Sequence, residues 1–161
     1  MPSDAVSIEP GGLADVPDVI RLIRRVFDEY GFIWEPLQEV PDLLHHFERR
    51  YASPGGAFFV AREAGEVRGS VGVERLADGT AELHRLYLDA HLRRRGVGAA
   101  LVETVLAWCR AEGIGRLILW SDTRFDRAHT LYTRLGFRRT GERELPGDVN
   151  QTREYGFERE V

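Results

Sequence analysis

A loop with two glycines, between an apolar strand pattern and an amphipathic helix pattern, most constrains what this chain can fold into. Residues 86–101 read Leu-Tyr-Leu-Asp-Ala-His-Leu-Arg-Arg-Arg-Gly-Val-Gly-Ala-Ala-Leu. Gly96 and Gly98 let a ligand approach the backbone closely, and the first N–H groups of the following helix have no intrahelical partner. With the helix dipole, these amides form a site that suits a phosphate or a pyrophosphate. The sequence therefore predicts an anion-binding loop.

Other phosphate binders and nucleic-acid binders fit poorly. A Walker loop needs a lysine, and the chain has none; the dinucleotide fingerprint needs a third glycine where Leu101 stands. All 22 basic residues are arginine, and 26 acidic residues bring the net charge to −4, so nucleic acid is not expected as a partner. A bare Gly-x-Gly with solvated arginines is also an ordinary turn, which leaves a purely structural role open.

Length and composition fit one globular domain over residues 1–161. Of these residues 43% are hydrophobic, which is enough for a core without metal or disulfide support. Cys109 is the single cysteine, so an internal disulfide is excluded, and its place on an apolar helix face predicts a buried packing residue. No pattern in the sequence suggests a metal site. The N-terminus lacks the basic and apolar regions of a signal peptide, and no apolar run approaches the ~20 residues that span a bilayer. We therefore expect a soluble, cytoplasmic protein with no membrane partner.

Hydrophobic periodicity predicts a mixed α/β sheet with helices on its faces. Helical spacing indicates helices over about 16–30, 41–51, 99–113 and 126–135. Strand patterns occupy about 6–8, 57–63, 67–76, 80–88, 117–120, 137–143 and 153–161. The three middle strands are expected to form an antiparallel meander, and the last two an antiparallel pair. The all-apolar segment 117–120 is typical of a strand buried on both faces.

Two separate segments carry motifs that occur together in one protein family. Residues 93–98 read Arg-x-x-Gly-x-Gly after a strand that ends in Leu-x-Leu. Residues 128–137 read Ala-x-x-Leu-Tyr-x-x-x-Gly-Phe. In register, they resemble the acetyl-CoA motif and a later motif of the GNAT superfamily (GCN5-related N-acetyltransferases). The resemblance covers residues 57–140 by motif and the rest by element order, and it is closest to a small, bacterial-type, single-domain member.

The resemblance implies a mostly antiparallel sheet of about seven strands, flanked by about four helices and splayed between the fourth and fifth strands, 80–88 and 116–121. It implies acetyl-CoA as co-substrate, with its pantetheine arm on the main chain of Leu86 and Leu88, on either side of Tyr87. The pyrophosphate would lie on the loop and helix start: Arg93, Arg94, Arg95, Gly96, Val97, Gly98 and Ala99. Phe125 stands where the family often has an asparagine on pantetheine, so Arg124, Asp126 or the backbone alone would replace that contact.

Acetyl transfer to an amine also needs groups that move protons. A phenol titrates near pKa ~10 and a thiol near ~8.5, so a tyrosine can protonate a departing thiolate. Tyr132 matches the family position that supplies this proton, although a helix tyrosine is otherwise an ordinary core aromatic. The Leu88 amide would polarise the thioester carbonyl, as the resemblance implies.

Two residues compete as the base. Glu82 and His84 lie two apart on one strand, so their side chains share a face. Glu82 stands six residues before Leu88, where GCN5-type histone acetyltransferases place a base glutamate. A closed cleft would raise the pKa of Glu82 toward neutral, whereas a histidine titrates near ~6.5 when unperturbed. A water chain, or a satisfied polar strand residue in each place, is the alternative.

The acceptor site is expected at the loop after the first helix and at the late strands. Phe32, Trp34 and Glu35 would form an aromatic wall with a carboxylate that suits a cationic amine, or the aromatics only cap the core. The polar loop 145–151 could flex over the site. Pairing of the final strands, as in dimers of this family, makes a homodimer a further expectation.

These features favour an N-acetyltransferase that moves an acetyl group from acetyl-CoA to a primary amine of a small molecule or an amino acid, by direct attack in a ternary complex. The alternatives are an acyl-CoA-binding sensor without turnover, an acetyltransferase acting on protein N-termini or side chains, and an O-acetyltransferase. Fold alone does not separate them.

Overall fold

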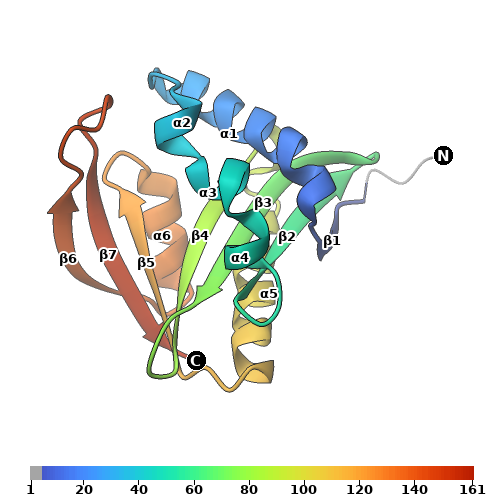
Figure 1. Cartoon of the computed structure of the whole chain (residues 1–161), viewed down its shortest axis with the longest axis vertical. Helices are drawn as coiled ribbons and strands as arrows, with labels where there is room; N and C mark the ends of the chain where they lie inside the picture. Colours follow the sequence, from blue (N-terminus) through green and yellow to red (C-terminus); the bar gives the residue numbers. More distant parts are fainter. Residues whose placement is uncertain (1–4) are drawn as a thin grey trace.

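The structure, a computed structural model, describes residues 5–161. The prediction that the N-terminus lacks the basic region of a signal peptide concerns residues 1–4, which lie outside the described residues. Within the described range, seven strands form one sheet in the order β1-β2-β3-β4-β5-β7-β6, which runs from the right to the left of Figure 1. Neighbouring strands are antiparallel except β4 and β5, which are parallel. The predicted mixed, mostly antiparallel α/β fold is confirmed.

The strands follow the sequence pattern closely. Their bounds are β1 Ser7–Pro10, β2 Gly56–Glu63, β3 Glu66–Arg75, β4 Thr80–Leu88, β5 Arg116–Asp122, β6 Arg138–Glu144 and β7 Arg153–Glu160. β5 differs from the expectation of a strand buried on both faces: Leu117 and Leu119 are buried, whereas Ile118 and Trp120 are half-buried. Trp120 is only half-buried because it lines a cavity on that side of the sheet.

The helices are more broken than predicted. Six α-helices lie in residues 5–161: α1 Val16–Tyr30, α2 Pro36–Glu39, α3 Pro41–His45, α4 Phe47–Tyr51, α5 Val97–Ala111 and α6 Asp126–Arg134. The single helix expected over 41–51 is two short ones, because the backbone leaves helical geometry at His46, with φ −132° and ψ 15°. α5 begins at Val97, two residues before the expected start.

Two apolar clusters lie on opposite faces of the sheet. Figure 1 shows α1 to α4 on one face, where Leu22 and Phe58 are buried, and α5 on the other, where Leu101 and Leu106 are buried. Cys109 on α5 is buried in the second cluster, as expected of a packing residue. In the described part of the chain, no helix is long and apolar enough to cross a membrane.

β4 and β5 separate partway along their length. Residues 80–83 of β4 pair with residues 116–119 of β5, and the pairing ends there. On its other edge β4 carries a β-bulge, where Arg85 and Leu86 together oppose Val71 of β3. Arg85 takes a left-handed conformation, with φ 55°. The unpaired end of β4 is the splay that the family resemblance implied.

Candidate active site

The predicted phosphate loop joins β4 to α5. Gly96 caps α5 with φ 77°, a conformation that side chains rarely adopt. An added Cβ at Gly98 would lie 3.2 Å from Leu131, so this glycine lets α5 approach α6 closely. Among the described residues, no acceptor takes the amides of Arg94, Arg95 or Gly96, and the first turn of α5 offers further amides. The loop therefore presents unpaired amides, which is the geometry that the predicted anion site requires.

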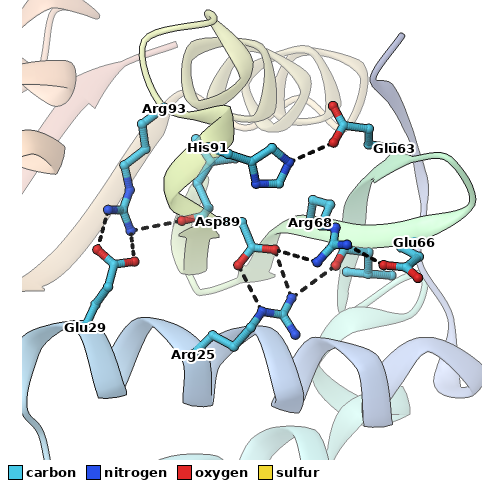
Figure 2. Close-up of polar contacts among 10 residues, drawn as sticks. Arg25, Glu29, Glu63, Glu66, Arg68, Asp89, His91 and Arg93 are labelled. Carbon is cyan, nitrogen blue, oxygen red and sulfur yellow. Dashed lines mark hydrogen bonds and ion pairs between the residues drawn. The ribbon is translucent and has the colours of Figure 1, made fainter. Parts of the chain in front are cut away.

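The three arginines of the loop differ in what they contact. The Arg93 guanidinium donates to both carboxylate oxygens of Glu29, at 2.5 and 2.8 Å, and to the Leu88 carbonyl at 3.1 Å (Figure 2). Arg95 pairs with a carboxylate of β2 at 3.1 Å. The Arg94 guanidinium has no hydrogen-bond or ion-pair partner in residues 5–161, and it lines the cavity. Arg94 is thus the loop cation that is free for an anionic ligand.

Ion pairs also fix the start of the loop (Figure 2). Asp89 is buried and accepts hydrogen bonds from Arg25, at 3.0 and 2.9 Å, and from Arg68 at 3.3 Å. Glu63 contacts His91 at 2.7 Å. These contacts come from α1, β2 and β3, so the loop is anchored to three elements before any ligand binds.

A cavity of about 910 Å³ extends from the loop through the splay. The predicted site residues that line it are Phe32, Glu82, His84, Leu86, Tyr87, Leu88, Arg93, Arg94, Gly96, Gly98, Ala99, Phe125 and Tyr132. Arg95, Val97, Trp34 and Glu35 do not line it. Asp89 donates its amide to Arg68 of β3 at 2.8 Å, so the preceding Leu88 N–H points to the open edge of β4.

Tyr132 combines a buried ring with an accessible hydroxyl. The ring, with only 4% of the residue exposed, packs against Phe137 and Phe157 at 5.7 and 5.5 Å between centroids. Its hydroxyl has no hydrogen-bond partner in the described range. Because every fully buried side-chain polar atom in that range has a partner, the Tyr132 hydroxyl is not fully buried, and it reaches the cavity that Tyr132 lines. Burial, with a smaller effect of Tyr87, raises the pKa of Tyr132, so the phenol stays protonated.

Glu82 and His84 lie together on the wall of the cavity, with Glu82 Oε1 3.4 Å from His84 Nε2. The expected direction of the Glu82 pKa is wrong. Burial alone would raise it, but the contact with His84 and the positive charges of Arg143 and Arg50 lower the pKa of Glu82 below its usual value. Glu82 therefore remains a carboxylate in the free protein.

A buried hydrogen-bonded network continues behind His84. Tyr51 contacts His84 Nδ1 at 3.0 Å and donates to Asp42 Oδ2 at 2.5 Å. Arg85 donates to both oxygens of Asp42, at 3.1 and 2.6 Å, and to the Glu39 carbonyl at 2.7 Å. Burial opposes the charge of Asp42, but the Arg85 guanidinium and the hydrogen bonds outweigh it and lower the pKa of Asp42.

The sequence motifs did not single out Asp42, Tyr51 or Arg85. Asp42 and Tyr51 lie in the segment expected to be one amphipathic helix, where a polar residue every turn is ordinary. The available signal was Arg85, since an arginine inside an apolar strand needs a buried anionic partner.

The end of the cavity where the sequence predicts the acceptor is bridged by side chains from distant segments. Phe125 packs on Tyr30 and Phe32, at 4.8 and 5.8 Å between centroids. Asn150 accepts from the Ile33 amide at 2.8 Å and donates to its carbonyl at 3.0 Å, which joins loop 145–152 to the segment after α1. Trp34 instead packs on Phe27 at 5.3 Å, the core-capping alternative. In the described range no group of acidic, histidine or cysteine residues could hold a metal.

Comparison with known proteins agrees with this geometry. Residues 21–137 match the acetyltransferase (GNAT) family. The uncharacterized N-acetyltransferase YjgM of Escherichia coli is 31% identical over 129 residues, 78% of this chain and 77% of that protein. N-acetylaspartate synthetase of Danio rerio is 38% identical over 105 residues, and human N-acetyltransferase 8 is 37% identical over 93 residues. These matches cover 62% and 55% of this chain, but it spans only 37% and 41% of those two relatives.

Solved structures show the same fold. A GNAT acetyltransferase from Staphylococcus aureus Mu50 superposes with a TM-score of 0.84 at 24% identity, over 97% of this chain and 99% of that one. The family match spans most of the described strands and helices, including both motifs. The chain therefore belongs to the GNAT acetyltransferase family.

Proposed function

We propose that residues 1–161 act as one acetyltransferase domain that moves an acetyl group from acetyl-CoA to a primary amine of a small molecule, by direct attack in a ternary complex. The observation that carries this proposal is one cavity that joins the phosphate loop, the Tyr132 hydroxyl and the Glu82–His84 pair. A donor site for the acyl carrier, an acid and a base are what such a transfer requires.

The residues present fit acetyl-CoA. The unpaired amides of the loop and the free guanidinium of Arg94 suit its phosphates. The open edge of β4 offers main-chain groups to the amides of the pantetheine arm, as an added strand would. Phe125 lines the cavity and gives an apolar contact where the family often has an asparagine.

The chain's own groups then carry the proton chemistry. Acetyl-CoA supplies the thioester. The Leu88 amide, which points to the open edge of β4, donates to the thioester carbonyl as negative charge develops there. Tyr132 gives its proton to the departing thiolate. The Glu82–His84 pair takes the proton of the acceptor's ammonium group.

The closed acceptor end favours a small acceptor over a folded protein. The Asn150 side chain hydrogen-bonds to both main-chain groups of Ile33, and the Arg124 guanidinium lies 4.1 Å from the centroid of Phe32. A protein acceptor needs a groove through which its backbone can pass, and contacts that join two segments at this end of the cavity disfavour such a groove.

Arg50 supports an amino acid as the acceptor. It is half-buried on the cavity wall, its charge lowers the pKa of Glu82, and its guanidinium has no ion-pair or hydrogen-bond partner in residues 5–161. A carboxylate beside the reacting amine would complete that site. One relative in the same family is named N-acetylaspartate synthetase, after an acetylated amino acid.

Release of CoA thiol from acetyl-CoA tests the proposal against amines, amino acids, amino-acid amides and peptides. We expect amino acids to be preferred over their amides, and Arg50→Gln to remove that preference. Tyr132→Phe should lower the acceptor-dependent rate at least tenfold, about 1.4 kcal/mol of barrier, with acetyl-CoA affinity retained. Preference for peptides would refute the small acceptor. Tight acyl-CoA binding without release for any acceptor would favour the sensor.

A further inference from the structure

Five side chains form a continuous polar line from the protein interior to the cavity. In order, they are Arg85, Asp42, Tyr51, His84 and Glu82. The inner members are buried, with Asp42 4% and Tyr51 3% exposed. A buried network of this kind has few alternative hydrogen-bond arrangements, so the position of each proton follows from its neighbours.

The hydroxyl of Tyr51 has only one proton to donate. Asp42 is ionised beside Arg85, and an ionised carboxylate only accepts. The 2.5 Å contact therefore places the Tyr51 proton toward Asp42, and the phenol oxygen accepts from His84 Nδ1 at 3.0 Å. Burial and the charge of Asp42 raise the pKa of Tyr51, so the hydroxyl keeps its proton.

On the basis of the proposed function, we propose that Tyr51 and Asp42 are positioning residues that fix the neutral His84 ring with its proton on Nδ1, so that Nε2 accepts the proton of the acceptor. Neutral imidazole carries one N–H. Once Nδ1 holds it, Nε2 is the free base, and it is the nitrogen that lies 3.4 Å from Glu82. Glu82 then stabilises the imidazolium that forms.

The proton steps balance. The N–H bond of the acceptor ammonium breaks and a proton binds His84 Nε2, directly or through water. The free amine attacks the thioester carbon, the C–N bond forms and the C–S bond breaks, and the thiolate takes the proton of Tyr132. A second proton from the attacking nitrogen restores Tyr132. The proton on His84 leaves to solvent, so each turnover releases one proton.

Charged and titratable groups from several elements act on His84 or on its neighbours Glu82, Tyr51 and Asp42. Glu74 on β3 lies 3.9 Å from Nδ1 and attracts a proton to that nitrogen, whereas the Glu82 carboxylate, 3.4 Å from Nε2, attracts one to Nε2. Tyr51 decides for Nδ1, because its 3.0 Å contact is a hydrogen bond, and the Glu82 contact has an ion-pair distance without hydrogen-bond geometry. The others are Glu82 and Arg85 on β4, Tyr51 and Arg50 on α4, Asp42 on α3 and Arg143 on β6. Because the pKa of Glu82 is lowered, its carboxylate is a weak base, so its role is to stabilise the charged ring and not to take the proton first.

Nitrogen-15 NMR of the histidine rings tests the proposal in the protein without substrates. We expect neutral wild-type His84, assigned by loss of its signals in His84→Gln, to show a protonated Nδ1 and an unprotonated Nε2. Tyr51→Phe should shift the neutral ring toward the Nε2–H form. It should lower kcat about tenfold or more, with an unchanged KM for acetyl-CoA, because the base is then correctly protonated only part of the time. Tyr155→Phe is the matched control, since its hydroxyl has no partner in the described range and lies outside the cavity.

An Nε2–H ring in the wild-type protein overturns the proposal, as does a Tyr51→Phe variant with unchanged tautomer and kcat. The wild-type spectrum, assigned with His84→Gln, does not depend on Tyr51→Phe, so it decides even if Tyr51→Phe fails to fold. Absence of acetyl transfer in a protein whose ring is Nδ1–H would refute the proposed function and with it the step at Nε2, whereas the tautomer assignment would stand.

Discussion

Removing the guanidinium of Arg85 should destabilise the fold strongly, because it leaves the Asp42 carboxylate buried without its cation. The side chains of Arg85 and Asp42 are 20% and 5% exposed, and two hydrogen bonds join them. Breaking a buried pair by removing one partner costs about 3–5 kcal/mol. We therefore expect Arg85→Met to lower the free energy of unfolding by about 3–4 kcal/mol, a large share of the ~5–15 kcal/mol typical of a domain.

Urea unfolding at two pH values measures this cost. In the wild type the pKa of Asp42 lies below its usual ~3.9, so its contribution is present above that pH and is lost as the pH falls through the folded value. In Arg85→Met, burial without the guanidinium raises the Asp42 pKa, and the variant gains stability as the carboxyl takes up a proton. The difference between the two proteins should therefore be largest near pH 7 and shrink toward pH 4.

Two further variants separate a buried pair from an ordinary surface contact. Arg153→Met removes an arginine that is 54% exposed and contacts Glu142 and Glu144, so it should cost about 1 kcal/mol or less. The double variant Arg85→Met, Asp42→Leu removes both charges and should be more stable than Arg85→Met alone. A cost of Arg85→Met no larger than that of Arg153→Met, or one independent of pH, would refute the reasoning.

Three other outcomes follow from the structure. Gly96→Ala forces an alanine to φ 77°, so it should cost about 1–2 kcal/mol and weaken acetyl-CoA binding in calorimetry, whereas Gly115→Ala, with open space around it, should change neither. Asn150→Ala removes both contacts to Ile33, so steady-state kinetics should show a higher KM for a small acceptor and new activity on peptides; an unchanged acceptor range would contradict the bridge. Burial raises the pKa of Cys109 to about 11, so a thiol reagent at pH 8 should modify it only after unfolding in urea, and rapid labelling of the native protein would count against this placement.

Much of the fold is predictable because it depends on local apolar spacing. The bounds of β4, expected at 80–88, agree with the structure, and the meander and the last strand pair also follow from period-two patterns. The segment 41–51 was harder, since its apolar residues keep helical spacing across a break that only the backbone at His46 shows. The burial of Trp120 was overestimated for a different reason. Trp120 lines the cavity at the splay, and where β4 and β5 separate depends on the pairing of segments that are distant in the sequence.

Site prediction was most informative where a motif fixes local geometry. Four loop residues line the same cavity as Tyr132 of α6, as the two motifs imply for the family: Arg93, Arg94, Gly96 and Gly98. The prediction of acceptor residues depends on a loop whose course the sequence leaves open, and Trp34 and Glu35 do not line the cavity. Asn150, which bridges that end, is 117 residues from Ile33.

The bulge in β4 explains why regular alternation along that strand does not predict the polar network around His84 and Arg85. Before the bulge, Leu83 packs toward α5; after it, Leu86 and Leu88 do, so the alternation changes parity between them. His84 and Arg85 consequently face the same side, and both reach the Asp42–Tyr51 pair. Regular alternation would have placed Arg85 beside Leu83 in the apolar core, where its charge would have no partner. A left-handed arginine is a costly conformation, and it persists because the surroundings hold it: Asp42 binds the guanidinium, and the Ser70 hydroxyl donates to the Arg85 carbonyl at 2.7 Å. The same bulge thus shifts the register of β4 against β3 and brings the candidate base next to the residues proposed to fix its proton.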